Sequence, residues 1–163
     1  MLLIFAFGFL GHATPSARRI KDIEAIASGL SADSLMKNVT VLINPGIPGP
    51  AWAYMTAPET FVIEYNPNLL SLFNAAGQDF IIFHELGHVR LGHVANPKPS
   101  LEELHEYEFE ADTFATFIWQ RFARGTRTEL QQFFEFTRAL KDTPPTAPPG
   151  HERVRLCESL LAK

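Results

Sequence analysis

Residues 84–88 read HELGH, an HExxH pattern whose spacing suits the binding of a metal ion. On a helix, residues four positions apart lie on one face, so His84 and His88 could direct two imidazoles at the same ion. Zinc accepts imidazole nitrogen well, and a catalytic zinc site keeps one coordination position open for water. Glu85 would lie beside that water and could act on it as a general base without binding the metal.

Two histidines leave a catalytic zinc site one protein ligand short. His93, five residues after His88, would lie about 140° round the same helix, so we reject it as a ligand. His105, in the next expected helix, is one candidate for the third ligand. The other candidates are the carboxylates of residues 105–112, which read HEYEFEAD.

Helical spacing separates these carboxylates. Glu108 and Asp112 are four residues apart and share a face with Ala111, whose small side chain would let two helices approach closely. Glu106 and Glu110 are displaced from that face. The spacing therefore favours Glu108 as the third zinc ligand, with Asp112 one turn further on accepting the other ring N–H of a ligand histidine and orienting its ring.

The elements that must position these residues form an α+β fold, in which a small β-sheet packs on a helical core. That core holds the HExxH helix and a Glu-bearing helix. Runs of β-branched residues predict strands, and helical periodicity with N-cap residues predicts helices. The expected strands are 39–43, 51–55 and 60–65, and the expected helices are 16–30, 68–75, 78–94, 101–124, 128–141 and 151–162.

The chain has 163 residues, which is enough for one domain with its own core. We divide it into a metallopeptidase domain over 16–141 and a Pro-rich connector with a C-terminal helix over 142–163, both in one domain. Residues 1–15 are either a buried N-terminal segment or the remnant of a signal or anchor. Within them, residues 2–10 are all apolar or Gly, a run shorter than the roughly 20 residues that span a bilayer.

Composition excludes several classes of function. The net charge of −4 gives no basic surface for nucleic acid. The single Cys157 excludes an intrachain disulfide framework and a Cys-rich zinc module.

The sequence does not fix the cellular compartment. We favour the cytoplasm, with a periplasmic or secreted location as the alternative that the N-terminal run would support. Contact with a membrane would depend on that same run.

The combination of FHELGH with EFEAD twenty residues later resembles the gluzincin metallopeptidases, which carry HExxH plus ExxxD. The CAAX prenyl protease/HtpX-like family has the most similar pattern, and the resemblance covers about residues 39–118. It implies a zincin fold with a bound Zn²⁺. The roles it implies are zinc ligand for His84, His88 and Glu108, general base for Glu85, and outer hydrogen-bond partner for Asp112.

The resemblance also implies how substrate binds and how the transition state is stabilised. An extended protein or peptide substrate would add to the edge of the strand that carries Trp52 and Tyr54. Family members have an Arg near the C-terminus in the pattern HPxxxxR, which Arg153 matches, although Thr143 stands where the His would be. Either Arg153 or His151, which lies between Thr143 and Arg153, would stabilise the oxyanion.

The sequence thus predicts a zinc-dependent endopeptidase that hydrolyses peptide bonds by a zinc-bound water with a Glu general base. A second group, the ImmA/IrrE-like metallopeptidases, has HExxH with ExEA(N/D)xFA, and EFEADTFA fits that pattern too. That resemblance implies a regulatory protease that cuts a repressor. A further alternative is a latent or non-catalytic zincin-fold regulatory or binding protein, which a fourth protein ligand on the metal would favour.

Overall fold

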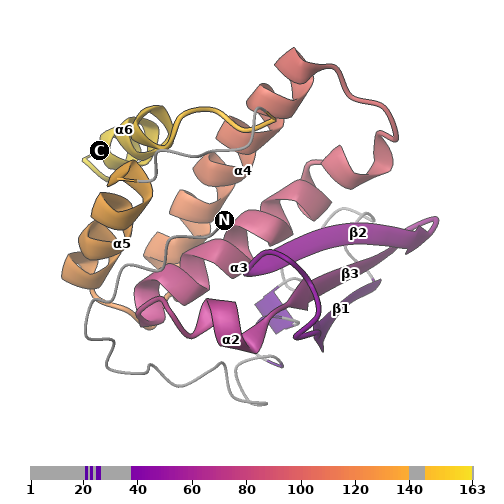
Figure 1. Ribbon diagram of the computed structural model, residues 1–163, viewed down its shortest axis with the longest axis horizontal. Coiled ribbons are helices and arrows are strands. Elements are labelled where there is room, and N and C mark those ends of the chain that lie inside the picture. The colour runs from indigo at the N-terminus through magenta and orange to yellow at the C-terminus, as the bar shows by residue number, and fades with distance from the viewer. Residues whose placement is uncertain (1–20, 22, 24, 27–37, 140–145, 163) are drawn as a thin grey trace.

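The computed structural model describes residues 21, 23, 25–26, 38–139 and 146–162. The fold is α+β, as expected: a three-stranded sheet lies along one side of a set of helices (Figure 1). Segment 1–15, part of the Pro-rich connector and most of the helix expected over 16–30 lie outside the described residues, although residues 21, 23, 25 and 26 are helical.

The sheet consists of β1 (Asn38–Ile43), β2 (Ala51–Ala57) and β3 (Thr60–Tyr65) in the order β1-β3-β2. β2 and β3 form an antiparallel hairpin, and β1 pairs with β3 in parallel. All three expected strands are confirmed, and β2 continues to Ala57, two residues past its expected end. β2 therefore forms one edge of the sheet.

The helix expected over 68–75 is shorter than predicted. α2 (Pro67–Leu70) is a single turn, capped by Asn66, whose side chain accepts from the backbone N–H groups of Asn68 and Leu69. Asn74 then caps the next helix by accepting from Gly77 N–H. An N-cap residue has non-helical backbone angles, so Asn74 must interrupt the helix that was expected to cross it.

α3 (Ala75–Arg90), which contains HELGH, is the central helix of the fold (Figure 1). One side packs on the sheet in a hydrophobic cluster that includes Ile82, Leu86 and Val89. The other side packs on the remaining helices in a second cluster that includes Phe80 and Phe83. Because α3 is covered on both sides, its polar residues lie among buried neighbours rather than on a solvated face.

α3 ends at Arg90, four residues earlier than expected. Gly92 has a φ of +79°, in the left-handed region where an α-helix cannot continue. A short 3₁₀ helix, η2 (His93–Ala95), follows it. The prediction of one continuous helix over 78–94 is therefore wrong, and residues after Gly92 do not follow the helical wheel of α3.

Three further helices match their expected positions within two residues: α4 (Leu101–Phe122), α5 (Arg127–Ala139) and α6 (Gly150–Leu161). Ser100 caps α4 by accepting from Glu103 N–H, and the Glu103 carboxylate accepts from Ser100 N–H in return. α6 packs against α4 and α5 in the second cluster, which also contains the buried thiol of Cys157. Burial raises the pKa of that thiol to about 12, so it stays protonated and inert.

α3 and α4 approach each other closely at small residues. Ala111, which was expected at the helix contact, is fully buried, and so is Ala115 one turn further along α4. Gly87 faces Ala111, and a Cβ atom built on Gly87 would lie 3.1 Å from Ala111 Cα and 3.2 Å from its carbonyl oxygen. This contact sets the distance between the HELGH helix and the helix that carries Glu108.

Replacing Gly87 by Val is expected to lower the free energy of unfolding by about 1–3 kcal/mol, because the added side chain would meet the α4 backbone. Urea unfolding measures the loss. Gly49→Val is the matched control, since a Cβ there would meet Ala51 oxygen at an ordinary 3.7 Å. An unchanged unfolding midpoint for Gly87→Val would contradict the close contact.

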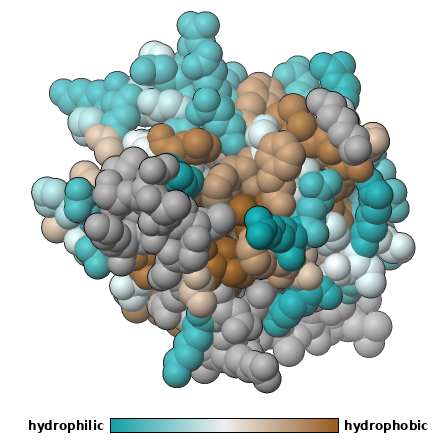
Figure 2. Space-filling view, turned by 180° about the vertical axis from the view of Figure 1, so that it is seen from behind, coloured by the Kyte–Doolittle hydropathy of each residue, from teal (hydrophilic) through white to brown (hydrophobic). Residues whose placement is uncertain are grey.

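The surface carries hydrophobic side chains as well as polar ones. Figure 2 shows the face opposite to that of Figure 1, where hydrophobic side chains gather near the middle and hydrophilic ones lie around them. A shallow groove between α4 and α6 is lined by Phe109, Phe114, Phe117 and Leu156. Among the described helices, none is long and apolar enough to cross a bilayer.

Candidate metal centre

His84 and His88 lie one turn apart on α3 and direct their Nε2 atoms at the same point. The two Nε2 atoms are 3.0 Å apart, and the ring planes cross at 84°. His84 is buried and His88 is half-buried. Two imidazole nitrogens this close need a proton or a cation between them, because their lone pairs would otherwise face each other.

α4 adds a carboxylate to the two imidazoles. Glu108 Oε2 lies 3.5 Å from His84 Nε2, and Glu108 Oε1 lies 3.4 Å from His88 Nε2. One ligand atom from each of these three residues lies within 4.8 Å of the others. This cluster contains Glu108 and not His105, the other candidate for the third ligand.

The spacing of the three residues fits a small tetrahedral metal ion. Two ligand atoms at about 2.0–2.1 Å from one tetrahedral zinc lie about 3.3 Å apart. The contacts among His84, His88 and Glu108 are 3.0, 3.4 and 3.5 Å. Imidazole nitrogen and carboxylate oxygen are also the donor types that zinc takes. The donor set and its geometry therefore both suit zinc.

Asp112 and Arg153 hold the cluster from behind. The Nδ1 atom of His84 lies 2.9 Å from Asp112 Oδ1, on the side of the ring away from Glu108. Arg153, which reaches in from α6, donates from Nε and Nη2 to the two oxygens of Asp112, each at 2.7 Å. Its Nη1 lies 2.9 Å from Glu108 Oε2. One guanidinium thus fixes both carboxylates in place.

These contacts also set the charges. Burial opposes the ionised form of both carboxyls, but bonds from the histidines lower the pKa of Glu108, and those from Arg153 lower the pKa of Asp112. Burial also opposes the charged form of Arg153, which by itself would lower its pKa. The bonds to Asp112 outweigh burial and raise the pKa of Arg153. For His84, burial is likewise outweighed by bonds to Asp112 and Glu108, which raise its pKa to about 10 in the metal-free site.

The metal-free protein is expected to lose stability as the pH rises from 6.5 to about 10. The folded chain keeps the His84 proton to about pH 10, whereas the unfolded chain releases it near pH 6.5. The contribution of His84 to the free energy of unfolding is therefore complete below pH 6.5 and is lost by about pH 10. Urea unfolding of chelator-treated protein across this interval measures the loss, with zinc-saturated protein, which needs neutral His84, as the comparison. A flat metal-free curve would contradict the strong pairing of His84.

Glu85 follows His84, the first candidate ligand, on α3 and is half-buried. It does not belong to the three-residue metal cluster. Burial raises the pKa of its carboxyl, which the positive charge of the neighbouring histidines only partly offsets. A carboxylate with a raised pKa next to a metal site is a suitable proton acceptor.

The structure places His93 at the site, although the sequence argument put it on the far side of the helix. Its Nδ1 atom lies 3.0 Å from His88 Nδ1, and its Nε2 atom lies 2.9 Å from Glu110 Oε2. The expectation that His93 faces away is corrected, because Gly92 turns the chain back before His93 begins η2. Gly92 itself, just after the motif, was the available signal for this turn.

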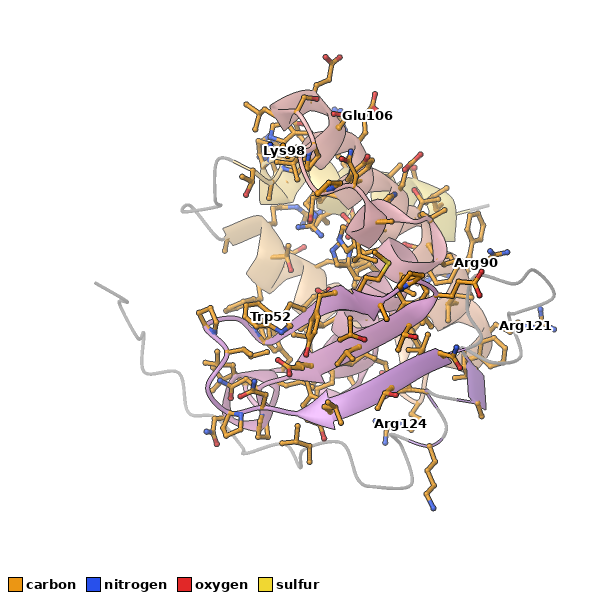
Figure 3. All side chains as sticks on the ribbon, turned by 90° about the vertical axis from the view of Figure 1, so that its right-hand side faces the viewer. Trp52, Arg90, Lys98, Glu106, Arg121 and Arg124 are labelled. Atoms are coloured by element: carbon orange, nitrogen blue, oxygen red, sulfur yellow. The ribbon has the colours of Figure 1, made fainter. Side chains whose placement is uncertain are left out.

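The remaining predicted residues lie further from the cluster. The His151 side chain is 67% exposed, and its Nε2 atom lies 3.9 Å from Glu152. No hydrogen bond or ion pair in the described part of the chain joins it to the three candidate ligands. Glu106 is exposed near the outer end of α4, as Figure 3 shows. Of the two residues expected to bind an oxyanion, the structure brings only Arg153 to the metal cluster.

The edge strand β2 carries a polar network that the sequence did not indicate. The indole N–H of Trp52 and the hydroxyl of Tyr54 each donate to the Glu64 carboxylate at 2.9 Å, and the Asn44 amide donates at 3.0 Å. These bonds, that from Trp52 first, lower the pKa of Glu64. Trp52 is nevertheless 43% exposed on the sheet (Figure 3). The network holds the side chains of Trp52 and Tyr54 in place, and β2 is an edge strand of the sheet.

Comparison with protein families gives the class of protein. A family model described as Peptidase U49 matches residues 16–140, which include the sheet, α3 and α4 and therefore all three candidate ligands. The match defines a peptidase, as the sequence predicts. The chain belongs to the Peptidase U49 family. Neither a search of curated proteins nor one of solved structures found a match.

Proposed function

We propose that this peptidase is a zinc-dependent endopeptidase of the gluzincin type. The observation that carries the proposal is the convergence of His84, His88 and Glu108 at the spacing of a tetrahedral zinc site, within a chain of a peptidase family. Glu85, the neighbour of the first histidine, supplies the proton acceptor that such hydrolysis needs.

Zinc bound by these residues would polarise the scissile carbonyl and lower the pKa of a bound water to about 7. Glu85 accepts the proton of the attacking water and passes it to the nitrogen of the leaving amine. The raised pKa of Glu85 suits both transfers, because its carboxyl can hold the proton between them. Asp112 keeps the His84 proton on Nδ1, so that Nε2 presents its lone pair to the metal.

Arg153 is proposed to position the two carboxylates. It bonds both oxygens of Asp112 and lies 2.9 Å from Glu108. These bonds favour a positioning role over direct contact with an oxyanion. We assign no contact with the reacting atoms to His151, whose side chain points largely into solvent.

A peptide substrate is proposed to bind as an extended strand along the outer edge of β2, which pairs with no other strand among the described residues. β2 lies at the edge of the sheet and packs near α3 and η2, so a strand added there would lie alongside the metal cluster. Backbone hydrogen bonds of such a strand supply affinity without a side-chain preference. The bonds of Trp52 and Tyr54 to Glu64 keep the strand in a fixed conformation.

Cleavage of a mixed library of quenched fluorescent peptides tests this function. The proposal predicts cleavage that a chelator abolishes and added zinc restores, with endoproteolytic rather than terminal products. Cleavage that survives removal of all metal would overturn the zinc mechanism. Products shortened one residue at a time from a terminus would overturn the endopeptidase assignment.

A further inference from the structure

His93 does not belong to the metal cluster but lies directly against His88, which does. Gly92 in the left-handed conformation ends the path of α3 and allows η2 to return His93 against the helix it has just left. The residue is only 7% exposed. A buried imidazole must have hydrogen-bond partners for both ring nitrogens or pay for their desolvation.

Both ring nitrogens of His93 have partners. Nδ1 lies 3.0 Å from Nδ1 of His88, and Nε2 lies 2.9 Å from Glu110 Oε2. The ring stacks on Tyr107, with centroids 4.1 Å apart and planes 7° from parallel. The Tyr107 hydroxyl in turn accepts from the Asn96 amide at 2.9 Å. The orientation of His93 is therefore fixed by its contacts on several sides.

The Nδ1–Nδ1 contact determines where the protons lie. One hydrogen bond between two nitrogens needs one donor and one acceptor. His88 directs Nε2 at His84 and Glu108, where a metal would take its lone pair, so its proton belongs on Nδ1. His93 must then accept at Nδ1, carry its own proton on Nε2 and donate it to Glu110.

We propose that His93 is a positioning residue that fixes the tautomer and ring orientation of His88, so that His88 Nε2 is presented to the metal. The inference rests on the proposed metal site. It assigns to His88 what Asp112 provides for His84, an acceptor behind the ring, but from a neutral imidazole instead of a carboxylate. Residues that orient a metal ligand in this way matter for affinity without touching the metal.

Two substitutions separate this role from simple packing. His93→Phe keeps a planar ring to stack on Tyr107 but removes the acceptor. His93→Asn loses the ring but keeps an acceptor, because the Asn Oδ1 atom can occupy the place of His Nδ1. If His93 acted only by filling space, Phe would be the milder change. If it acts as the acceptor for His88, Asn is the milder change.

Zinc affinity, measured by competition with a chromophoric chelator, tests the proposal. His93→Phe is expected to bind zinc about 10–100-fold more weakly than the unaltered protein, and His93→Asn is expected to recover most of that loss. Urea unfolding of both metal-free variants checks that they fold. An equal affinity for His93→Phe and the unaltered protein, or a weaker affinity for Asn than for Phe, would overturn the proposal.

Nitrogen-15 spectra of the histidine side chains in zinc-loaded protein give an independent readout. The expected spectrum has the proton of His93 on Nε2 and that of His88 on Nδ1; a proton on His93 Nδ1 would overturn the assignment. Zinc uptake distinguishes failure of the proposed function from failure of the role of His93. If the unaltered protein takes up no zinc, the proposed function fails, whereas zinc uptake that His93→Phe leaves unchanged removes only the role of His93.

Discussion

Replacing Glu85 by Gln is expected to reduce peptide cleavage by about 10²–10⁴-fold while leaving zinc binding intact. The amide has nearly the same shape as the carboxyl but cannot accept a proton from the attacking water. Zinc should stay bound, because the cluster that holds it consists of His84, His88 and Glu108. Steady-state cleavage and zinc content, measured on the same preparation, test both halves of this expectation.

Glu106→Gln is the matched control for this change. This substitution removes the same charge as Glu85→Gln, but Glu106 lies exposed on α4, outside the metal cluster. Its cleavage rate should equal that of the unaltered protein. If Glu85→Gln cleaved at the same rate as Glu106→Gln, the assignment of Glu85 as general base would be wrong.

Replacing Glu108 by Ala is expected to weaken zinc binding by at least about 100-fold, more than the loss of a residue that only orients a ligand. The change removes a carboxylate whose oxygens lie near both imidazoles, at 3.5 and 3.4 Å from their Nε2 atoms. It also takes a partner from the guanidinium of Arg153. Metal content after dialysis and chelator competition measure the effect, and activity should disappear with the zinc.

Glu108→Gln separates the loss of the ligand from the loss of packing. The Gln side chain can still accept from Arg153, but it lacks the negative charge that favours zinc coordination. Both variants should therefore lose zinc, while Gln should keep more of the stability of the metal-free fold. Full zinc occupancy in Glu108→Ala would move the third ligand elsewhere, with His105 as the first candidate to replace in turn.

Helical spacing was sufficient to predict which residues share a face within each of the two helices. His84 and His88 are four apart within α3, and Glu108 and Asp112 are four apart within α4, so each pair shares a face on a regular helix. The small side chain of Ala111 indicated where the two helices touch, and the structure places it there fully buried. These inferences needed only the geometry of two uninterrupted helices.

The position expected for His93 was wrong because the helical periodicity of α3 was extended past Arg90, where the helix ends. The true end depends on Gly92 adopting a positive φ, which glycine permits but does not require. The contact of His93 with Glu110 also joins segments seventeen residues apart across a turn. Periodicity describes positions within one element and says little about how the chain re-enters the structure after it.

Sheet pairing was predictable only in part. The connection between β2 and β3 is short, which favours an antiparallel hairpin, a local feature. The parallel pairing of β1 with β3 is non-local, since β2 comes between them in the chain and lies on the other side of β3. The bonds of Asn44 and Trp52 to Glu64 depend on the residue-by-residue register of both strand pairings, which no sequence pattern indicated.

The central claim is that His84, His88 and Glu108 form a zinc site, and the metal content of the protein purified without added metal tests it most directly. The account predicts about one zinc per chain, lost when His84 is replaced by Ala. Protein that contains no zinc and takes up none on titration would contradict it, leaving a Peptidase U49 family member whose HELGH helix serves another purpose.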